Sequence, residues 1–213
     1  TEFMFMIRTV APSEDEQYRL YRQVVEASHG HSCTIRLFDV GGDKPPAYMD
    51  IGKEANPALG YRGARFLLSN PEFLQPHLRA ILRTTVHGRV NILVPMVADL
   101  EDVVEMQRAL NEATKALDEA GIHYRNDFRF GVMLEVPSAF WALPAMLPHI
   151  DFVSIGTNDL VQYTFAVDRT NSRVNRWYRQ FHPVILRMIK DTCAMVSEYP
   201  GKSVSICGEL AGN

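Results

Sequence analysis

The residues best suited to chemistry lie in one stretch, residues 151–169, where an apolar run gives way to polar side chains. Thr157, Asn158 and Asp159 follow the run, and Arg169 closes the stretch. Carboxylate oxygens suit Mg²⁺, and arginine binds phosphate or carboxylate through paired hydrogen bonds. The simpler alternative is that Thr157 or Asn158 caps a helix whose N-terminal end favours Asp159. Both interpretations stay open, because helix N-termini also bind anions.

Alternating strand and helix patterns must position this stretch. Short apolar runs typical of buried strands cover residues 34–38, 90–94, 130–134, 152–155 and 204–206. Helical patterns begin at a Ser13–Glu16 capping box, at Asn56-Pro57 and at Asn70-Pro71. The helix after Asn56-Pro57 would carry Arg62 and Arg65. Further helical patterns cover residues 100–120, 138–147 and 183–198. Buried strands that alternate with helices favour a parallel sheet with helices on its faces.

Polar residues stand at or just after several of these strands. Because the carboxyl ends of parallel strands lie on one side of a sheet, we expect Arg36, Glu135, Asn158, Asp159 and Cys207 to converge. Glu135 and Asp159 together suit Mg²⁺, although Glu135 alone would more simply be a buried salt-bridge partner.

Two further groups of residues bear on the chemistry. Arg36, Arg62, Arg169 and Lys44 could hold a phosphate or carboxylate, although each alone is more simply a surface charge. The Cys207 thiol could act as a proton donor or nucleophile beside cations, or could be a small buried apolar group.

Composition limits the function classes. The chain has 213 residues, a net charge of -3 and three cysteines, which favours one domain, no nucleic-acid partner and a reducing, cytoplasmic setting. No apolar run approaches the roughly 20 residues of a membrane helix, so no membrane insertion is expected. Because the chain begins at Thr1 and stops at Asn213, we expect it to be a piece of a longer protein.

Six ordered motifs point to one known family. They are DFVSIGTNDLVQYTFAVDR at 151–169, TEF at 1–3, RLFDVGGDK at 36–44, NPALGYRGAR at 56–65, GVMLEVP at 131–137 and CGELAG at 207–212. The chain resembles, over essentially its whole length, the phosphoenolpyruvate-utilising enzymes, and within them the Enzyme I group of the bacterial phosphotransferase system. Pyruvate phosphate dikinase and phosphoenolpyruvate synthase share the Asn-Asp and Cys-Gly-Glu elements, but the DVGGDK loop and the AVDR ending resemble Enzyme I. LEVPSAFWALP and AVDRTNSRV look closer to its nitrogen-related paralogue than to the sugar-transport form.

The resemblance implies a fold and a set of residue roles. The fold would be an α/β (βα)₈ TIM-type barrel, truncated at both ends, with about five of its eight strands in residues 1–213. The barrel would bind phosphoenolpyruvate and Mg²⁺, with Glu135 and Asp159 as metal ligands and Cys207 as the acid that protonates the enol carbon to give pyruvate. The substrate-binding positions implied are Arg36, Lys44, Arg62, Asn158 and Arg169.

The resemblance also implies partners. The phosphoryl group would pass to a histidine on a separate domain and then to an HPr-like phosphocarrier protein, within a cytoplasmic homodimer. That histidine domain, an arginine just before TEF, and the first two and the eighth barrel strands are expected to lie outside the chain, which alone would be inactive.

Two alternatives remain. One is a ligand-sensing module that dimerises without catalysis, which the retained acid and metal residues argue against. The other is a dikinase or synthase barrel; a dikinase would require a nucleotide-binding domain elsewhere.

Overall fold

The computed structural model describes residues 4–5, 9–40, 46, 48–49 and 51–212. Its contacts divide the chain into two compact units. Unit 1 comprises Thr1–Val94 and Val104–Arg129, and unit 2 comprises Pro95–Val103 and Phe130–Asn213. Each unit is described by itself.

The described part of unit 1 contains two parallel strands, with helices before and after them. Strand β1 pairs with β2 in the register Cys33↔Val90 to Arg36↔Leu93. The elements in order are α2 (Glu14–Ala27), β1 (Cys33–Arg36), η1 (Pro57–Leu59), α3 (Ala64–Ser69), α4 (Pro71–Thr84), η2 (Thr85–His87), β2 (Val90–Val94) and most of α5 (Leu100–Glu119). Its apolar core includes Leu37, Phe38, Leu67, Leu78 and Ile81, all fully buried or nearly so.

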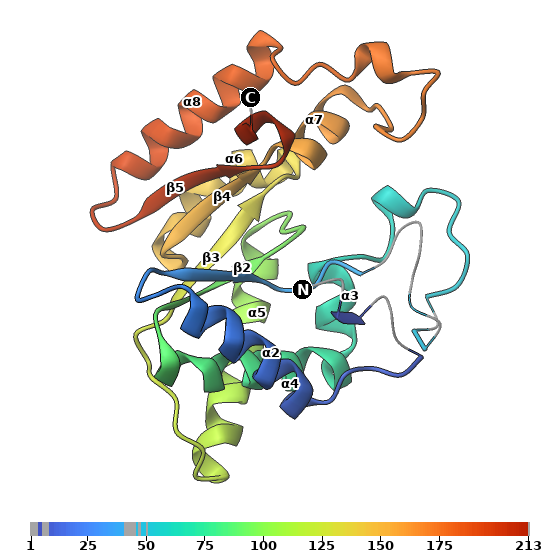
Figure 1. Ribbon diagram of the computed structural model, residues 1–213. Helices are drawn as coiled ribbons and strands as arrows, with labels where there is room; N and C mark the ends of the chain where they lie inside the picture. The colour runs from blue at the N-terminus through green and yellow to red at the C-terminus, as the bar shows by residue number, and fades with distance from the viewer. Residues whose placement is uncertain (1–3, 6–8, 41–45, 47, 50, 213) are drawn as a thin grey trace. The chain divides into compact units, whose positions relative to one another are not determined.

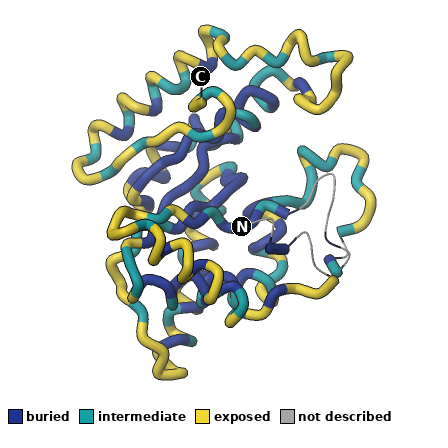
Figure 2. Tube along the Cα trace, in the orientation of Figure 1, coloured by how far each residue is buried: buried dark blue, intermediate teal, exposed yellow. Residues whose placement is uncertain are grey.

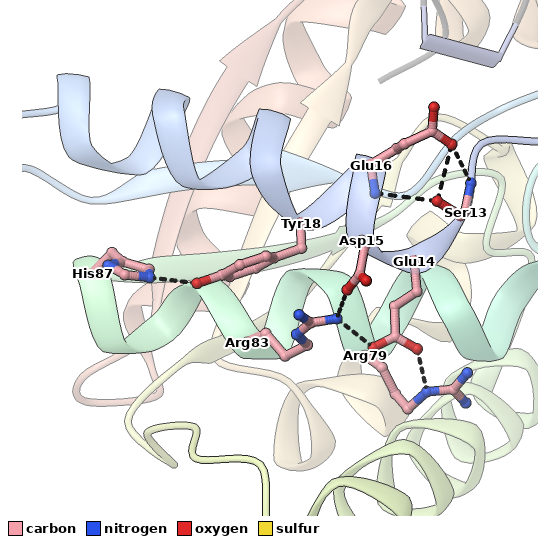
Figure 3. Close-up of polar contacts among 8 residues, drawn as sticks. All are labelled: Ser13, Glu14, Asp15, Glu16, Tyr18, Arg79, Arg83 and His87. Atoms are coloured by element: carbon pink, nitrogen blue, oxygen red, sulfur yellow. Dashed lines mark hydrogen bonds and ion pairs between the residues drawn. The ribbon is translucent and has the colours of Figure 1, made fainter.

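The start of α2 uses its acidic residues twice. The predicted capping box is present: the Glu16 amide donates to Ser13 Oγ, and the Ser13 amide donates to Glu16 Oε2 at 2.9 Å (Figure 3). Next to it, the Glu14 carboxylate accepts hydrogen bonds from Arg79 Nε at 2.7 Å and Arg83 at 2.8 Å. The first turn of α2 is therefore stabilised by its own cap and attached to α4, which lies beside it in Figure 1.

The helix predicted after Asn56-Pro57 is partly wrong. Only a 3₁₀ turn, Pro57–Leu59, follows Asn56, whose side chain makes no capping bond. The α-helix begins later, at Ala64, because Gly63 adopts a left-handed φ of 56° that ends the preceding loop. Arg62 therefore lies before the helix rather than on it. The Asn70 side chain also does not cap α4. Its Nδ2 donates instead to Phe66 O at 2.7 Å.

Unit 2 contains three parallel strands with β4 between β3 and β5. Strand β3 pairs with β4 from Gly131↔Phe152 to Leu134↔Ile155, and β4 pairs with β5 from Phe152↔Ser203 to Gly156↔Cys207. The elements in order are β3 (Arg129–Leu134), α6 (Pro137–Met146), η3 (Leu147–His149), β4 (Phe152–Gly156), α7 (Thr157–Phe165), η4 (Asn175–Trp177), α8 (Pro183–Ser197), β5 (Ser203–Cys207) and η5 (Glu209–Gly212).

Burial in unit 2 is greatest along the central strand. Every residue of β4 is buried, whereas β5 is half-buried to exposed (Figure 2). Helix α8 packs against β5 and α6. No helix in the described part of the chain combines the length and apolar character that a membrane crossing requires.

The strand predictions agree with the structure to within two residues at each end. The repeated strand–helix order and the parallel pairing confirm the predicted fold class, an α/β protein of the TIM-barrel type present in part. Five strands lie within the described residues.

The capping box gives a test of how α2 is stabilised. We expect Ser13→Ala to lower the free energy of unfolding by about 1 kcal/mol, because the Glu16 amide loses its acceptor. Urea unfolding measures this. Ser69→Ala is the matched control: that exposed hydroxyl donates to Arg65 O within its own helix, and we expect a change below about 0.5 kcal/mol. Equal losses in both variants would contradict the capping role.

Candidate functional site

The parallel register of unit 2 brings three sequence-distant positions to one level. Gly156 is the Cα partner of Cys207, and Ile155 is the partner of Leu134, so Glu135 follows β3 at the level of Gly156. Side chains alternate between the faces of a sheet, so side chains at one level of neighbouring strands share a face. Glu135, Gly156 and Cys207 thus form a row across the carboxyl ends of β3, β4 and β5.

Glu135 is held in place on two sides. The residue is 2% exposed, and its Oε1 accepts a hydrogen bond from the Met96 amide at 2.7 Å. Met96 adopts a left-handed φ of 58°, an uncommon conformation for a non-glycine residue, which places its amide at the carboxylate. A Cβ added to Gly156 would lie 2.7 Å from Glu135 Oε2. The carboxylate therefore occupies space that any other residue at position 156 would fill.

Asp159 lies in the first turn of α7, which begins directly after β4. It is 6% exposed, and its Oδ1 accepts a hydrogen bond from Gln162 Nε2 at 3.4 Å. Gln162 Oε1 in turn accepts from the Arg169 amide at 3.0 Å. Gln162 thus links two residues predicted for the site and was itself not predicted. Its position three residues after Asp159 on a helix was the available signal, because such residues share a helix face.

The side chains of Thr157 and Asn158 do not cap α7. The residue at the cap position is Gly156, which makes no side-chain capping bond. Thr157 Oγ1 instead donates to Cys207 O at 2.9 Å, and Asn158 Oδ1 accepts from the Glu209 amide at 2.9 Å. The capping alternative is therefore wrong for both side chains, which hold the turn after β5.

Gly208 explains why that turn can approach so closely. Its φ is +96°, and a Cβ there would lie 2.6 Å from Thr157 Oγ1 and 2.9 Å from Asn158 Oδ1. Both the backbone conformation and the lack of space require glycine. The structure thus explains why the middle residue of the Cys-Gly-Glu sequence is glycine.

Cys207 is half-buried, and its thiol contacts residues of β4. Ser154 Oγ donates to Cys207 Sγ at 3.4 Å, and the thiol donates to Ile155 O at 3.4 Å. The other cysteines lie elsewhere: Cys33, whose thiol pKa is raised by burial, is on β1, and Cys193 is exposed on α8. Cys193 is therefore not the small buried residue that an isolated cysteine usually is.

Unit 2 also contains a pocket of about 680 Å³. Its lining residues are Arg169, Thr170, Asn175, Tyr178, Gln180, Phe181 and Glu209. Tyr178 OH donates to Asn158 O at 3.1 Å, and burial, as the largest cause, raises the pKa of this phenol. The phenol is therefore a neutral donor near neutral pH, and it anchors the pocket wall to the start of α7.

The remaining predicted residues belong to unit 1. Arg36 ends β1, and Arg62 makes a bidentate ion pair with Asp39, with Nε–Oδ1 at 3.0 Å and a terminal nitrogen on Oδ2 at 2.5 Å. The two side chains are 13% and 4% exposed, so the guanidinium plane is firmly oriented. Lys44 lies outside the described residues. The predicted convergence of Arg36 with the unit 2 residues stays a prediction.

The donor set of unit 2 fits a hard cation. In the described part of the chain, no three His, Cys, Asp or Glu residues form a group that could hold a metal by themselves. Glu135, directly after β3, and Asp159, in the first turn of α7, are two buried carboxylates that could supply oxygen ligands. Mg²⁺ commonly takes one or two protein carboxylates and completes its octahedron with water and substrate oxygens.

The ion pair in unit 1 gives a second test. We expect Asp39→Asn to lower the free energy of unfolding by about 3 kcal/mol, because a largely buried guanidinium loses its countercharge. Urea unfolding measures the loss. Asp127→Asn is the matched control, since the Arg125–Asp127 pair has half-exposed side chains and should contribute less than about 1 kcal/mol. An Asp39 variant no less stable than the Asp127 variant would contradict this account.

Comparisons with known proteins agree on one family. The family described as "PEP-utilising enzyme, PEP-binding domain" matches residues 1–213. The chain is 41% identical over its whole length to a phosphoenolpyruvate-protein phosphotransferase of Staphylococcus carnosus, and 42% identical to one of Haemophilus influenzae. It spans 37% of the length of each of these relatives.

Among solved structures, a HpcH/Hpal aldolase/citrate lyase family protein from Burkholderia cenocepacia matches 90% of this chain and 77% of its own. The TM-score is 0.49 and the sequence identity 12%, a likeness too weak to carry functional information. The full-length family match and the two relatives lead to one conclusion: the chain belongs to the phosphoenolpyruvate-binding domain family of the PEP-utilising enzymes.

Proposed function

We propose that this chain is the phosphoenolpyruvate-binding part of a phosphoenolpyruvate-protein phosphotransferase. The observation that carries the proposal is the row at the strand ends of unit 2. There a buried carboxylate and a thiol stand at one level on either side of Gly156, which has no side chain. The lack of a side chain at Gly156 lets the carboxylate lie across it, so a candidate metal ligand and a candidate proton donor share one face of the sheet. The names of the relatives support the same activity.

The basic residues would neutralise the substrate. Arg36, Lys44, Arg62 and Arg169, with the Asn158 amide, are proposed to bind the phosphate and carboxylate of phosphoenolpyruvate. Transfer of a phosphoryl group needs positioning and charge neutralisation more than covalent chemistry from the protein. Asp39 would assist by fixing the plane of the Arg62 guanidinium before the substrate arrives.

Glu135 and Asp159 are proposed to hold Mg²⁺. When bound, the cation would neutralise charge on the phosphoryl and carboxylate oxygens. The chain's own contribution is to hold the two carboxylates: the Met96 amide orients Glu135, and the Gln162 side chain contacts Asp159. These contacts keep the ligands aligned without the ion.

Cys207 is proposed as the acid that completes the reaction. Transfer breaks the bond between phosphorus and the enol oxygen and forms a bond from phosphorus to a histidine nitrogen on another domain. The enolate of pyruvate that remains takes a proton at its methylene carbon, and the thiol at the end of β5 is the donor.

The wider context follows the same resemblance. An HPr-like phosphocarrier protein is proposed as the next acceptor, a homodimer as the assembly, and the cytoplasm as the location. The nitrogen-related branch is proposed over the sugar-transport branch.

The metal assignment is tested with binding. We expect Glu135→Gln and Gly156→Ala each to weaken Mg²⁺-dependent binding of phosphoenolpyruvate at least about tenfold, the first by removing charge and the second by displacing the carboxylate. Calorimetry with and without Mg²⁺ on the full-length protein measures both. Glu105→Gln, at an exposed position on α5, is the control. Unchanged Mg²⁺ dependence in both variants would refute the assignment.

The acid role is tested with kinetics. In the full-length protein we expect Cys207→Ala to lower kcat for pyruvate formation about a hundredfold, while KM for phosphoenolpyruvate changes little. A coupled pyruvate assay measures this, and Cys193→Ala, at an exposed cysteine on α8, is the control. A wild-type rate in the Cys207 variant would remove the acid from the proposal. Ligand-driven dimerisation without any phosphohistidine would instead favour a sensing module.

A further inference from the structure

We propose that Ser154 is a positioning residue for Cys207: its hydroxyl holds the thiol in the orientation for proton donation and stabilises the sulfur when the proton leaves. The inference rests on the proposed function, because it assumes that Cys207 is the acid. Ser154 itself touches no substrate in this account.

The contact follows from the strand register. Ser154 is the Cα partner of Ser205, and Gly156 is the partner of Cys207, so Ser154 and Cys207 are diagonal neighbours on one face of the sheet. Ser154 Oγ donates to Cys207 Sγ at 3.4 Å. Gly156 lies opposite Cys207, and the Glu135 carboxylate occupies the space over this glycine.

The sulfur is thereby held between a donor and an acceptor. Ser154 donates to it from one strand position, and the thiol donates to Ile155 O at 3.4 Å. Both contacts come from β4, the fully buried central strand of the unit. Two directional contacts from one strand hold the Cys207 side chain in a single rotamer. Partial burial alone would leave this side chain free to change rotamer.

Serine is out of place at this position on packing grounds alone. Ser154 is 5% exposed, and its register partner on β3, whose side chain shares its face of the sheet, is the apolar Met133. A hydroxyl buried among apolar groups costs free energy unless it makes a hydrogen bond. The bond to Cys207 satisfies that hydroxyl, so the polar residue and the thiol depend on each other.

The chemistry explains why a donor is needed there. When the enolate is protonated, the S–H bond breaks, its electron pair stays on sulfur, and the proton forms a new C–H bond with the π electrons of the enolate. The Ser154 hydroxyl then donates to an anionic sulfur, and hydrogen bonds to charged groups are about twice as strong as neutral ones. Water returns the proton to the thiolate after pyruvate leaves.

The test compares Ser154→Ala with Ser205→Ala in the full-length protein. Ser205 is the register partner of Ser154 on the exposed strand β5, so it controls for loss of a hydroxyl in the same sheet. We expect Ser154→Ala to lower kcat about tenfold or more, with KM for phosphoenolpyruvate nearly unchanged, because a hydrogen bond to a charged group is lost. The solvent deuterium isotope effect on kcat should rise, since proton transfer becomes slower. Ser154→Thr keeps the hydroxyl and should recover most of the rate.

A double-variant cycle separates positioning from a structural effect. We expect Ser154→Ala to cause no further loss of kcat in the Cys207→Ala background, because its effect passes through the thiol. The same loss in both backgrounds would overturn the inference, as would a wild-type kcat or a raised KM alone in Ser154→Ala. If Cys207→Ala itself has the wild-type rate, the proposed acid is wrong and this inference fails with it. A slow Cys207→Ala beside a normal Ser154→Ala refutes this inference only.

Discussion

The approach of the Glu135 carboxylate to Gly156 is the constraint on which the geometry of unit 2 depends. It requires an exact parallel register between β3 and β4, a residue without a side chain at the end of β4, and a backbone donor from Met96 to hold the second oxygen. A shift of one residue in either strand would move the carboxylate to the other face of the sheet.

The polar residues around this row are connected rather than merely close. Gln162 joins Asp159 to the backbone at Arg169, and Asn158 and Thr157 join the start of α7 to the turn after β5. These hydrogen bonds link elements up to 51 residues apart in the sequence, so displacement of one element would also displace the others. If Asp159 binds a cation and Arg169 an anion, as proposed, the two binding events would be thermodynamically coupled through Gln162.

The strands could be predicted from the sequence more accurately than the side-chain contacts around the candidate site. Strands 90–94 and 152–155 were located closely because continuous apolar runs bounded by turn residues have few other uses. The Asn56-Pro57 signal misled because Gly63, further along, decides where the helix begins. Gln162 had a weak helical-spacing signal, whereas the Ser154 and Met96 contacts had none. Their roles arise from strand register and from an unusual backbone angle, neither of which a single sequence displays.

Met96 also has a consequence for protein engineering. A non-glycine residue at a φ of 58° carries a conformational cost of order 1 kcal/mol, so Met96 stands out as a place where the chain could be stabilised by glycine. The same strain aims the amide that fixes Glu135. A search for thermostable variants would thus select Met96→Gly. The substitution would raise the stability of the fold, but the more flexible backbone at position 96 would hold the Glu135 carboxylate less firmly.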